Sequence, residues 1–372
     1  MSALYIHIPF CKSKCHYCNF FSTVSLKYKS ELVDSILIEL EQKKNYLSNN
    51  NLDTIYFGGG TPSILSNLEL SSIFKKIHEI YTVNSDCEIT FEANPDDISK
   101  EKLILYKELG INRLSIGIQS FNDKILAQLN RNHSAQEAIN AVILAKEYGF
   151  NNMNIDLIYG IPGLTESIWK EELEKFMEFD IPHLSAYALT VEPKTALNYL
   201  INKNKYPNLN EDESITHFNY LISYLNDHKY NQYEISNFSI EGFESKHNSN
   251  YWKNNEYLGI GPSANSYNIV SRQWNSSSIK NYINEINDKT NYFGIEFLTL
   301  DEQFNEYVML GLRTNWGIDL EIINSRFGQN YLEYLIEYFS KNLIKFDKKG
   351  NIVVLSKNYR MLADGIASDI FK

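Results

Sequence analysis

The sequence predicts an α/β protein built on an open, partial (β/α)6 barrel of the TIM type, followed by an irregular layer and a small helical, winged-helix-like domain. From the start to about residue 190, short β-rich runs alternate with longer amphipathic stretches, which is typical of strand–helix units around a parallel sheet. About six such units occur, too few for the closed eight-fold barrel. The chain then becomes rich in Asn, Ser and Tyr before helical periodicity returns near its end.

The strand–helix units can be drawn individually. The predicted strands, which are rich in apolar and β-branched residues, are Leu4–Ile8, Thr54–Phe57, Glu88–Ala93, Arg113–Ile118, Asn154–Ile158 and His183–Tyr187. The predicted helices, several of which end near a Gly or Pro stop signal, are Lys29–Lys44, Leu68–Ile80, Ser99–Leu109, Ala135–Tyr148 and Glu166–Phe179. In a barrel of this kind, functional groups gather at the carboxyl ends of the strands.

We expect three parts: a barrel over residues 1–200, an irregular region over 201–290 and a C-terminal domain over 291–372. The irregular region holds one helical candidate, Glu211–Asp227, and then a long turn-rich stretch with two aromatic clusters. The C-terminal part shows helical periodicity, followed by a predicted hairpin over Ile344–Leu355 that turns at Lys348-Lys349-Gly350. Its predicted helices are Asp301–Leu312, Leu320–Phe327 and Tyr331–Lys341.

The composition excludes several classes of protein. With 372 residues, of which 43% are hydrophobic, the chain can bury a large core. Its formal net charge of −11 argues against a broad nucleic-acid-binding surface and favours a packing or partner-binding role for the predicted wing. No apolar run approaches the roughly 18 residues of a membrane span, and no leader pattern precedes the first strand, so we expect a cytosolic protein.

Three of the four cysteines, Cys11, Cys15 and Cys18, lie within eight consecutive positions directly after the first predicted strand. This clustering suits a metal site in a reducing compartment better than a disulfide framework. Cys87 stands apart, beside an apolar alternation, and we expect it to be a small buried residue.

The cysteine triplet predicts a 4Fe-4S cluster with one open iron. Such a cube normally takes four thiolates, so three leave an iron that can accept an exchangeable ligand. The alternative is half of a zinc site, which would need further ligands such as His7 or His16. The three-then-two spacing is unusual for zinc, and we therefore favour the cluster.

With these motifs the sequence resembles the radical-SAM proteins of the oxygen-independent coproporphyrinogen III oxidase group, over nearly the whole chain. The opening motif runs from Tyr5 through His7 to Cys11, and the resemblance implies that Tyr5 belongs to the cofactor site. A glycine-rich turn follows the second predicted strand. In the family these glycines approach the methionine end of S-adenosylmethionine, and the resemblance implies that Gly59, Gly60 and Thr61 of the turn bind this cofactor. The residue that matches Tyr17 flanks the adenine of the same cofactor in the family.

Four polar residues near the ends of later strands also match the family. The resemblance implies that Arg131 pairs with the methionine carboxylate and that Gln119 and Asp156 donate to or accept from the ribose hydroxyls. Glu92 matches a carboxylate that serves a second S-adenosylmethionine in the oxidases. Taken singly, each would more often be a surface charge or a cap, but their placement at successive strand ends favours a shared site.

Two readings compete within this group. The oxidases look like C-x3-C-x2-C-x-C and carry an extension ahead of the motif, whereas here Phe20 takes the last position and the chain begins ten residues before Cys11. In both features the sequence resembles instead the HemW family of haem chaperones. The runner-up is an oxygen-independent coproporphyrinogen III oxidase or a related radical-SAM enzyme acting on tetrapyrroles.

A second motif, His247-Asn-Ser-Asn-Tyr251-Trp252, is similar to the H-N-x-x-Y-W pattern of the HemW family, in which the histidine is implicated in haem binding. A neutral imidazole is a good axial ligand for haem iron, and aromatic rings offer a flat apolar surface to a porphyrin. The alternative is a loop histidine beside two packing aromatics. Relatives often have histidine at the position of Asn265, so the resemblance implies no accessory ligand at this position here.

The resemblance therefore implies a haem chaperone rather than an enzyme, with a 4Fe-4S cluster, S-adenosylmethionine and haem as its cofactors. Haem bound through His247 would be passed to a haem-accepting protein. The resemblance allows an acceptor at a membrane surface and a homodimer, and the acidic net charge argues against a nucleic-acid partner.

Overall fold

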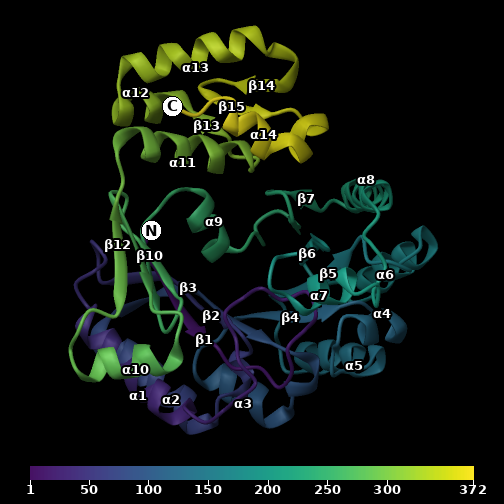
Figure 1. Ribbon diagram of the computed structural model, residues 1–372, viewed down its shortest axis with the longest axis vertical. Coiled ribbons are helices and arrows are strands. Elements are labelled where there is room, and N and C mark those ends of the chain that lie inside the picture. Colours follow the sequence, from purple (N-terminus) through teal and green to yellow (C-terminus); the bar gives the residue numbers. More distant parts are fainter.

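The computed structural model describes residues 1–372 and contains one large sheet and one small one (Figure 1). Six parallel strands lie at the centre of the large sheet in sequence order. They are β1 (Ala3–Ile8), β2 (Asn51–Gly59), β3 (Thr82–Ala93), β4 (Arg113–Gln119), β5 (Met153–Tyr159) and β6 (His183–Ala188). Each predicted strand is confirmed, and all six extend one or more residues beyond the predicted bounds.

The helices between these strands also match the prediction closely. They are α1 (Lys29–Gln42), α2 (Asn67–Ile80), α3 (Lys100–Glu108), α5 (Ala135–Glu147) and α6 (Glu166–Glu178). Capping boxes at Ser66 with Glu69 and at Ser134 with Glu137 satisfy the first amide groups of α2 and α5, which explains why these helices begin where they do. The sequence pattern did not reveal the short helices α4 (Asp123–Gln128) and α7 (Ala196–Asn202).

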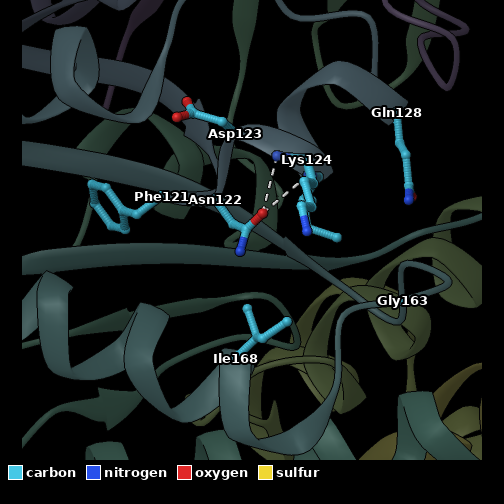
Figure 2. A pocket seen from close by; sticks show the side chains of 8 residues that line it. Phe121, Asn122, Asp123, Lys124, Gln128, Gly163 and Ile168 are labelled. Carbon is cyan, nitrogen blue, oxygen red and sulfur yellow. Dashed lines mark hydrogen bonds between the residues drawn. The ribbon is translucent and has the colours of Figure 1, made fainter.

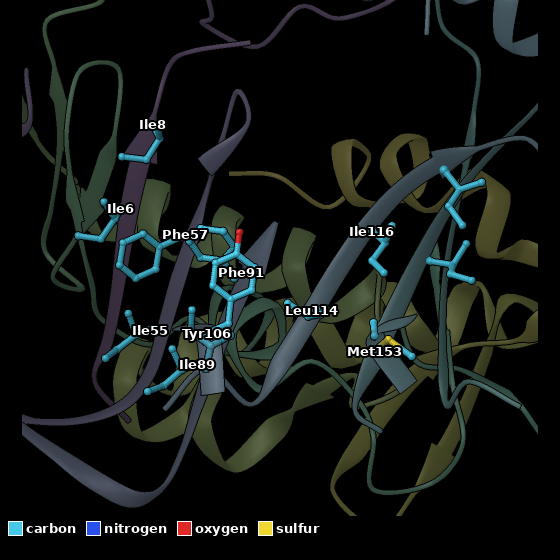
Figure 3. Close-up of a cluster of buried hydrophobic side chains, with 14 of the residues drawn as sticks. Ile6, Ile8, Ile55, Phe57, Ile89, Phe91, Tyr106, Leu114, Ile116 and Met153 are labelled. Atoms are coloured by element: carbon cyan, nitrogen blue, oxygen red, sulfur yellow. The ribbon is translucent and has the colours of Figure 1, made fainter. Parts of the chain in front are cut away.

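Alternate residues of the central strands face opposite environments. Figure 3 shows apolar side chains such as Ile55, Phe57 and Phe91 in the main core, where Tyr106 of α3 packs against Phe91 at 4.7 Å between ring centroids. Their neighbours along the strands are polar, for example Thr54 before Ile55. Because successive strand residues point to opposite faces, the apolar set packs under the helices and the polar set faces the inside of the barrel.

Residues 201–290 extend the sheet instead of forming the irregular layer that we predicted. Five strands, β7 to β11, come from this segment, with α8 (Glu211–Asp227), α9 (Lys246–Trp252) and α10 (Ile279–Asn287). They join opposite edges of the central sheet, since β8 pairs with β6 and β9 pairs with β1. The strands are β7 (Asn231–Gln232), β8 (Asn237–Ser239), β9 (Tyr257–Ile260), β10 (Asn265–Tyr267) and β11 (Ser271–Asn275). The prediction failed because these strands are only two to five residues long, and their pairing is decided by contacts distant in sequence.

The twelve-stranded sheet does not close into a barrel. It runs from β12 (Phe293–Phe297) at one edge to β7 at the other, and the two edges are not hydrogen-bonded to each other. The expected open, partial barrel is therefore confirmed. No helix in the chain combines the length and the apolar character that crossing a membrane requires.

The C-terminal part forms its own hydrophobic core and lies over one side of the sheet (Figure 1). A three-stranded sheet in the order β13–β15–β14 packs with four helices, and the predicted hairpin turns at Gly350, whose φ is +61°. The elements are α11 (Leu300–Leu312), β13 (Ile318–Asp319), α12 (Leu320–Phe327), α13 (Gln329–Lys341), β14 (Phe346–Lys349), β15 (Ile352–Leu355) and α14 (Ala363–Ser368).

A buried carboxyl group, Glu39 of α1, ties the first helix to the middle of the chain. It accepts hydrogen bonds from the Gly261 amide at 2.8 Å, from Asn275 Nδ2 at 2.7 Å and from the Tyr282 hydroxyl at 2.5 Å. Burial raises the pKa of Glu39 to about 7, although these three donors oppose the shift. The folded protein therefore keeps this proton at a pH where the unfolded chain has released it.

We expect the free energy of unfolding to fall as pH rises through this window. The stabilisation from protonated Glu39 is fully present below the unfolded pKa of about 4.3 and is lost as pH rises to the folded pKa, a change of roughly 2–3 kcal/mol between pH 5 and pH 8. Glu39→Gln should remove this part of the pH dependence in urea unfolding. Glu31→Gln, an exposed position on the same helix, is the control; an identical pH dependence in wild type and Glu39→Gln would contradict the assignment.

Candidate functional site

A cavity of about 570 Å³ opens at the carboxyl ends of the central strands. The polar faces of these strands end here, so side chains from distant parts of the sequence meet around one space. All but two of the thirteen residues that the sequence suggested line it. They are Cys11, Cys15, Tyr17, Cys18, Gly59, Gly60, Thr61, Glu92, Gln119, Arg131 and Asp156.

The three clustered cysteines lie on one loop between β1 and α1, and all three are free and half-buried. Backbone hydrogen bonds anchor this loop: the Cys11 amide donates to the Thr23 carbonyl at 2.9 Å, and the Leu197 amide donates to the His16 carbonyl at 2.7 Å. Burial is the largest influence on the thiols of Cys11 and Cys18 and raises the pKa of both. The loop therefore presents three sulfur atoms to the cavity from a fixed backbone.

The closing ligands that a zinc site would need are engaged elsewhere. A tetrahedral zinc ion bound by three thiolates needs a fourth ligand, whereas three thiolates of a cube each bind a different iron. His7 and His16, the closing ligands of the zinc alternative, bond elsewhere: His7 Nε2 lies 3.0 Å from the Phe21 carbonyl and His16 Nδ1 lies 2.9 Å from the Gln128 carbonyl.

Arg131 stands beside the cysteine loop with part of its hydrogen-bonding capacity unused. Its Nη1 donates to Cys15 Sγ at 3.2 Å, and its Nη2 donates to Asn94 Oδ1 at 2.7 Å and to the Gly117 carbonyl at 2.6 Å. The Nε atom is buried without a partner. A guanidinium with an unpaired buried donor next to the sulfur ligands fits a carboxylate.

The glycine-rich turn lets backbone lie where no side chain fits. Gly59 has a φ of +108°, and a Cβ there would lie 2.6 Å from the ring of His7. A Cβ on Gly60 would lie 2.6 Å from the Phe10 carbonyl oxygen. Thr61 next to them accepts a hydrogen bond from Asn94 Nδ2 at 3.1 Å. The turn thus forms a close backbone wall of the cavity.

Two carboxyl groups face the cavity from the strand ends. Glu92 accepts a hydrogen bond from the Tyr56 hydroxyl at 2.7 Å, and Asp156 accepts one from Asn154 Nδ2 at 2.6 Å. Burial raises the pKa of Glu92 to about 7 and also raises the pKa of Asp156. Gln119, at the end of β4, has a φ of +73°, an uncommon conformation that points to a local constraint at the site.

Tyr5 does not line the cavity. Its hydroxyl lies 3.0 Å from His7 Nδ1, and its ring is close to those of Tyr56 and His247, with centroids 6.1 and 6.4 Å away. Tyr5 therefore contacts the cavity wall only indirectly, because its hydroxyl bonds to His7 and the turn residue Gly59 packs on the His7 ring.

His247 also lies away from the cavity, inside the barrel on α9. The residue is 1% exposed, its Nδ1 is 2.8 Å from Thr54 Oγ1, and its Nε2 is 2.8 Å from the Tyr251 hydroxyl. Burial lowers the pKa of His247 to about 3, with a smaller effect from the charge of Arg113. The neutral ring thus has both nitrogens engaged and is stacked on Tyr56, with centroids 5.0 Å apart. In this conformation it cannot reach the iron of a porphyrin.

The start of α9 is held by another buried carboxyl group, that of Glu88 of β3. Glu88 accepts hydrogen bonds from the amides of Lys246 and His247 at 3.1 and 3.0 Å. Trp252, from the same motif, is covered by Arg313 of the C-terminal domain, 5.3 Å from its ring centroid. The motif therefore joins the barrel to the C-terminal domain.

The sequence reasoning missed Asn94 and Tyr56, which hold Arg131 and Glu92 in place. Asn94 follows Glu92 by two residues at the end of β3, and the strand-end rule that found Glu92 would also have found it. Tyr56 resembles an ordinary strand aromatic, and no sequence signal distinguishes it.

A second cavity, of about 490 Å³, lies beside α4 and is lined by eight residues (Figure 2). It contains none of the predicted site residues. Its Asn122 side chain is already used as a helix cap, accepting hydrogen bonds from the amides of Lys124 and Ile125. The Asn122 side chain at this cavity is therefore explained by its role as a helix cap, and we assign the cavity no function.

Comparisons with known proteins agree with this architecture. The model of the radical SAM superfamily matches residues 5–179, and that of the HemN C-terminal domain matches residues 298–358. The solved coproporphyrinogen III oxidase HemN of Escherichia coli aligns with a TM-score of 0.87 at 23% identity, covering 100% of this chain and 90% of that one. This likeness shows a shared fold. The family model thus assigns residues 5–179 to the radical SAM superfamily.

Curated relatives narrow the family further. A protein of Bacillus subtilis (strain 168) named heme chaperone HemW is 37% identical over 360 residues, which is 95% of this chain and 93% of the relative. The protein of that name from Lactococcus lactis is 33% identical, covering 94% of this chain and 92% of the relative. The Escherichia coli (strain K12) protein of that name is 36% identical over 263 residues, covering 70% and 68%. The chain belongs to the HemW family.

Proposed function

We propose that this chain is a haem chaperone that holds a 4Fe-4S cluster on Cys11, Cys15 and Cys18 and S-adenosylmethionine in the adjoining cavity. The observation that carries the proposal is the meeting of three free thiols with Arg131 at the wall of one cavity at the strand ends. When bound, a cube with three protein thiolates supplies an open iron for the amine and carboxylate of S-adenosylmethionine.

The residues around the cavity have separate tasks in this proposal. Arg131 pairs with the methionine carboxylate through its free donor, and the backbone of Gly59 and Gly60 lies along the methionine end. Gln119 and Asp156 hydrogen-bond the ribose hydroxyls. Tyr17 flanks the adenine, while Glu92, held by Tyr56, faces the remaining space. The family resemblance implies these roles, and the polarity of each group and its position on the cavity wall are compatible with them.

The haem part of the proposal rests on the name of the relatives and on the motif at His247. Relatives that span almost this whole chain are named heme chaperone HemW. Because His247 is sealed between Thr54, Tyr251 and Tyr56, its imidazole binds haem iron only after α9 moves away from β2. We propose that this opening precedes transfer of haem to an acceptor protein.

Titration of the reconstituted protein with haem tests this role. We expect His247→Ala to weaken haem binding by at least about tenfold, because it removes the axial ligand. His228→Ala, which changes an exposed histidine at the end of α8, should leave the affinity unchanged. Equal haem binding by wild type and His247→Ala would remove the haem role from this residue.

A Thr54→Val variant distinguishes an effect on haem ligation by His247 from a general loss of folding. It keeps the imidazole but deletes the 2.8 Å hydrogen bond to Nδ1, so α9 should open more readily. We expect haem to associate faster with this variant than with wild type in stopped-flow absorption.

Coproporphyrinogen-dependent formation of 5′-deoxyadenosine and protoporphyrinogen by the reconstituted wild-type protein would reject the chaperone assignment in favour of the oxidase alternative.

A further inference from the structure

A buried ion pair inside the barrel, between Arg113 and Glu88, makes no hydrogen bond in the observed conformation. Arg113 is the first residue of β4 and is 1% exposed. Its Nε atom lies 4.0 Å from Oε2 of Glu88 on β3, which is too far for a hydrogen bond. Neither Nε nor Nη2 of Arg113 has a partner within the chain. Buried donors are normally paired, so these two need an explanation.

The two unused donors belong to one edge of the Arg113 guanidinium. The N–H groups of Nε and Nη2 point in the same direction, and such an edge binds both oxygens of a carboxylate through two parallel hydrogen bonds. Because Nε is 4.0 Å from the Glu88 carboxyl group, an approach of roughly 1 Å brings the two groups to hydrogen-bonding distance. A rotation of side chains can supply this movement without a change in the sheet.

Glu88 does not bind Arg113 because the start of α9 occupies both of its oxygens. Its Oε1 accepts hydrogen bonds from the Ser245 hydroxyl at 3.3 Å and the His247 amide at 3.0 Å. Its Oε2 accepts one from the Lys246 amide at 3.1 Å. The amides at the start of a helix have no partner within the helix, so Glu88 satisfies donors that α9 cannot satisfy itself. The carboxyl group therefore anchors α9 to β3.

Movement of α9 away from the barrel removes these three donors from Glu88. A buried carboxylate that loses its donors is strongly destabilised, which opposes the movement. The free edge of Arg113 can replace the lost donors, since it offers two N–H groups and a positive charge. Glu88 thus has two alternative sets of partners, one for each position of α9.

We propose that Glu88 and Arg113 form a switch that allows α9 to detach from the barrel. In the closed position Glu88 binds the start of α9, and in the open position it binds the free edge of Arg113. An interaction that exists only in the open position shifts the equilibrium toward that position. Arg113 is therefore a positioning residue for His247, which moves with α9. The inference rests on the opening of α9 in the proposed function, but it does not require that the ligand is haem.

A purely structural role for Arg113 makes the opposite prediction. If Arg113 only neutralised Glu88, it would favour the charged carboxylate that holds the α9 amides, and its loss would loosen α9. In the switch, loss of Arg113 removes an interaction of the open position, so α9 should open less often. The two roles therefore differ in the sign of one measurable effect, the frequency with which α9 opens.

Hydrogen–deuterium exchange of the full-length protein, read by mass spectrometry, measures this opening without haem. Exchange in α9 reports the opening, and exchange in β5 reports unfolding of the whole barrel. We expect Arg113→Met to slow exchange in α9 by roughly tenfold or more, because a charge-assisted pair is lost from the open position alone. Arg113→Lys keeps the charge but lacks the two-donor edge, and it should slow exchange by about threefold. In a Glu88→Gln background, Arg113→Lys should change exchange by less than about twofold.

Arg272→Lys is the matched control. It makes the same substitution in an arginine of β11 that pairs with Glu306, and it should change exchange in α9 by less than about twofold. Unchanged exchange in Arg113→Met, or faster exchange in α9 with β5 still protected, would overturn the proposal. If Arg113→Met exchanges faster in β5 as well, the whole fold is destabilised, and Arg113→Lys decides by the same two criteria.

Haem titration separates this inference from the haem role. Slowed exchange in the Arg113 variants, together with no haem binding by wild type, would support the switch and reject the haem role. Normal haem binding by wild type, together with unchanged exchange in both Arg113 variants, would reject the switch and leave the haem role intact.

Discussion

Replacing Cys15 by alanine is expected to abolish the proposed cluster, the largest single effect that we anticipate. A cube held by two thiolates has two open irons and is not retained, so iron and sulfide should fall from about four per chain to near zero. The polypeptide should remain folded, because the loop is held by backbone hydrogen bonds to Thr23 and Leu197 and the main core does not include it.

The matched control is Cys87→Ala. Cys87 is buried at 3% accessibility, as the sequence predicted, and burial raises its pKa to about 12, so it is a packing residue. It should keep full iron and sulfide after anaerobic reconstitution. Retention of iron and visible absorption by Cys15→Ala, or their loss in Cys87→Ala, would show that the cluster lies elsewhere.

Replacing Arg131 by methionine should weaken S-adenosylmethionine binding by about 30-fold or more. The side chain is nearly isosteric along its stem but leaves the ligand carboxylate without its charged partner, and loss of one member of a desolvated charge pair costs about 2–5 kcal/mol. Equilibrium dialysis with the reconstituted protein measures the effect.

Two further variants show whether the geometry or the charge of the Arg131 side chain determines the affinity for S-adenosylmethionine. Arg131→Lys keeps the charge but loses the planar fork, in which Nη1 reaches Cys15 and Nη2 reaches Asn94 and Gly117, so we expect intermediate affinity. Lys14→Gln removes a charge that also lines the cavity and should change affinity by less than about threefold. Undiminished affinity in Arg131→Met, with the cluster intact, would contradict the assigned role.

The central fold could be predicted because local and global signals agree there. β4 was predicted as Arg113–Ile118 and runs to Gln119, and the C-terminal hairpin turns at Gly350, which has a φ of +61°. The segment around β9 and β10 was misread. Its strands are three or four residues long, and β9 becomes a strand only by pairing with β1, more than 250 residues earlier. Single-sequence periodicity contains no record of that pairing.

The candidate site could be assembled from strand ends but not from motifs alone. Cys11, Glu92 and Arg131 meet because parallel strands end at one edge of the sheet. His247 and Tyr5 belong to equally distinctive motifs, yet they face the inside of the barrel. Their burial depends on Thr54 and Tyr56 of β2, which the sequence presented as ordinary strand residues. The domain boundaries at 200/201 and 290/291, and the ligands themselves, stay predictions.

The most direct test of the account is electron paramagnetic resonance of anaerobically reconstituted, reduced protein with and without S-adenosylmethionine. We predict the signal of a 4Fe-4S cluster that changes when S-adenosylmethionine is added, because one iron has no protein ligand and accepts the added molecule. A cluster whose signal does not respond to S-adenosylmethionine, or a preparation with zinc and no cluster signal, would contradict the account.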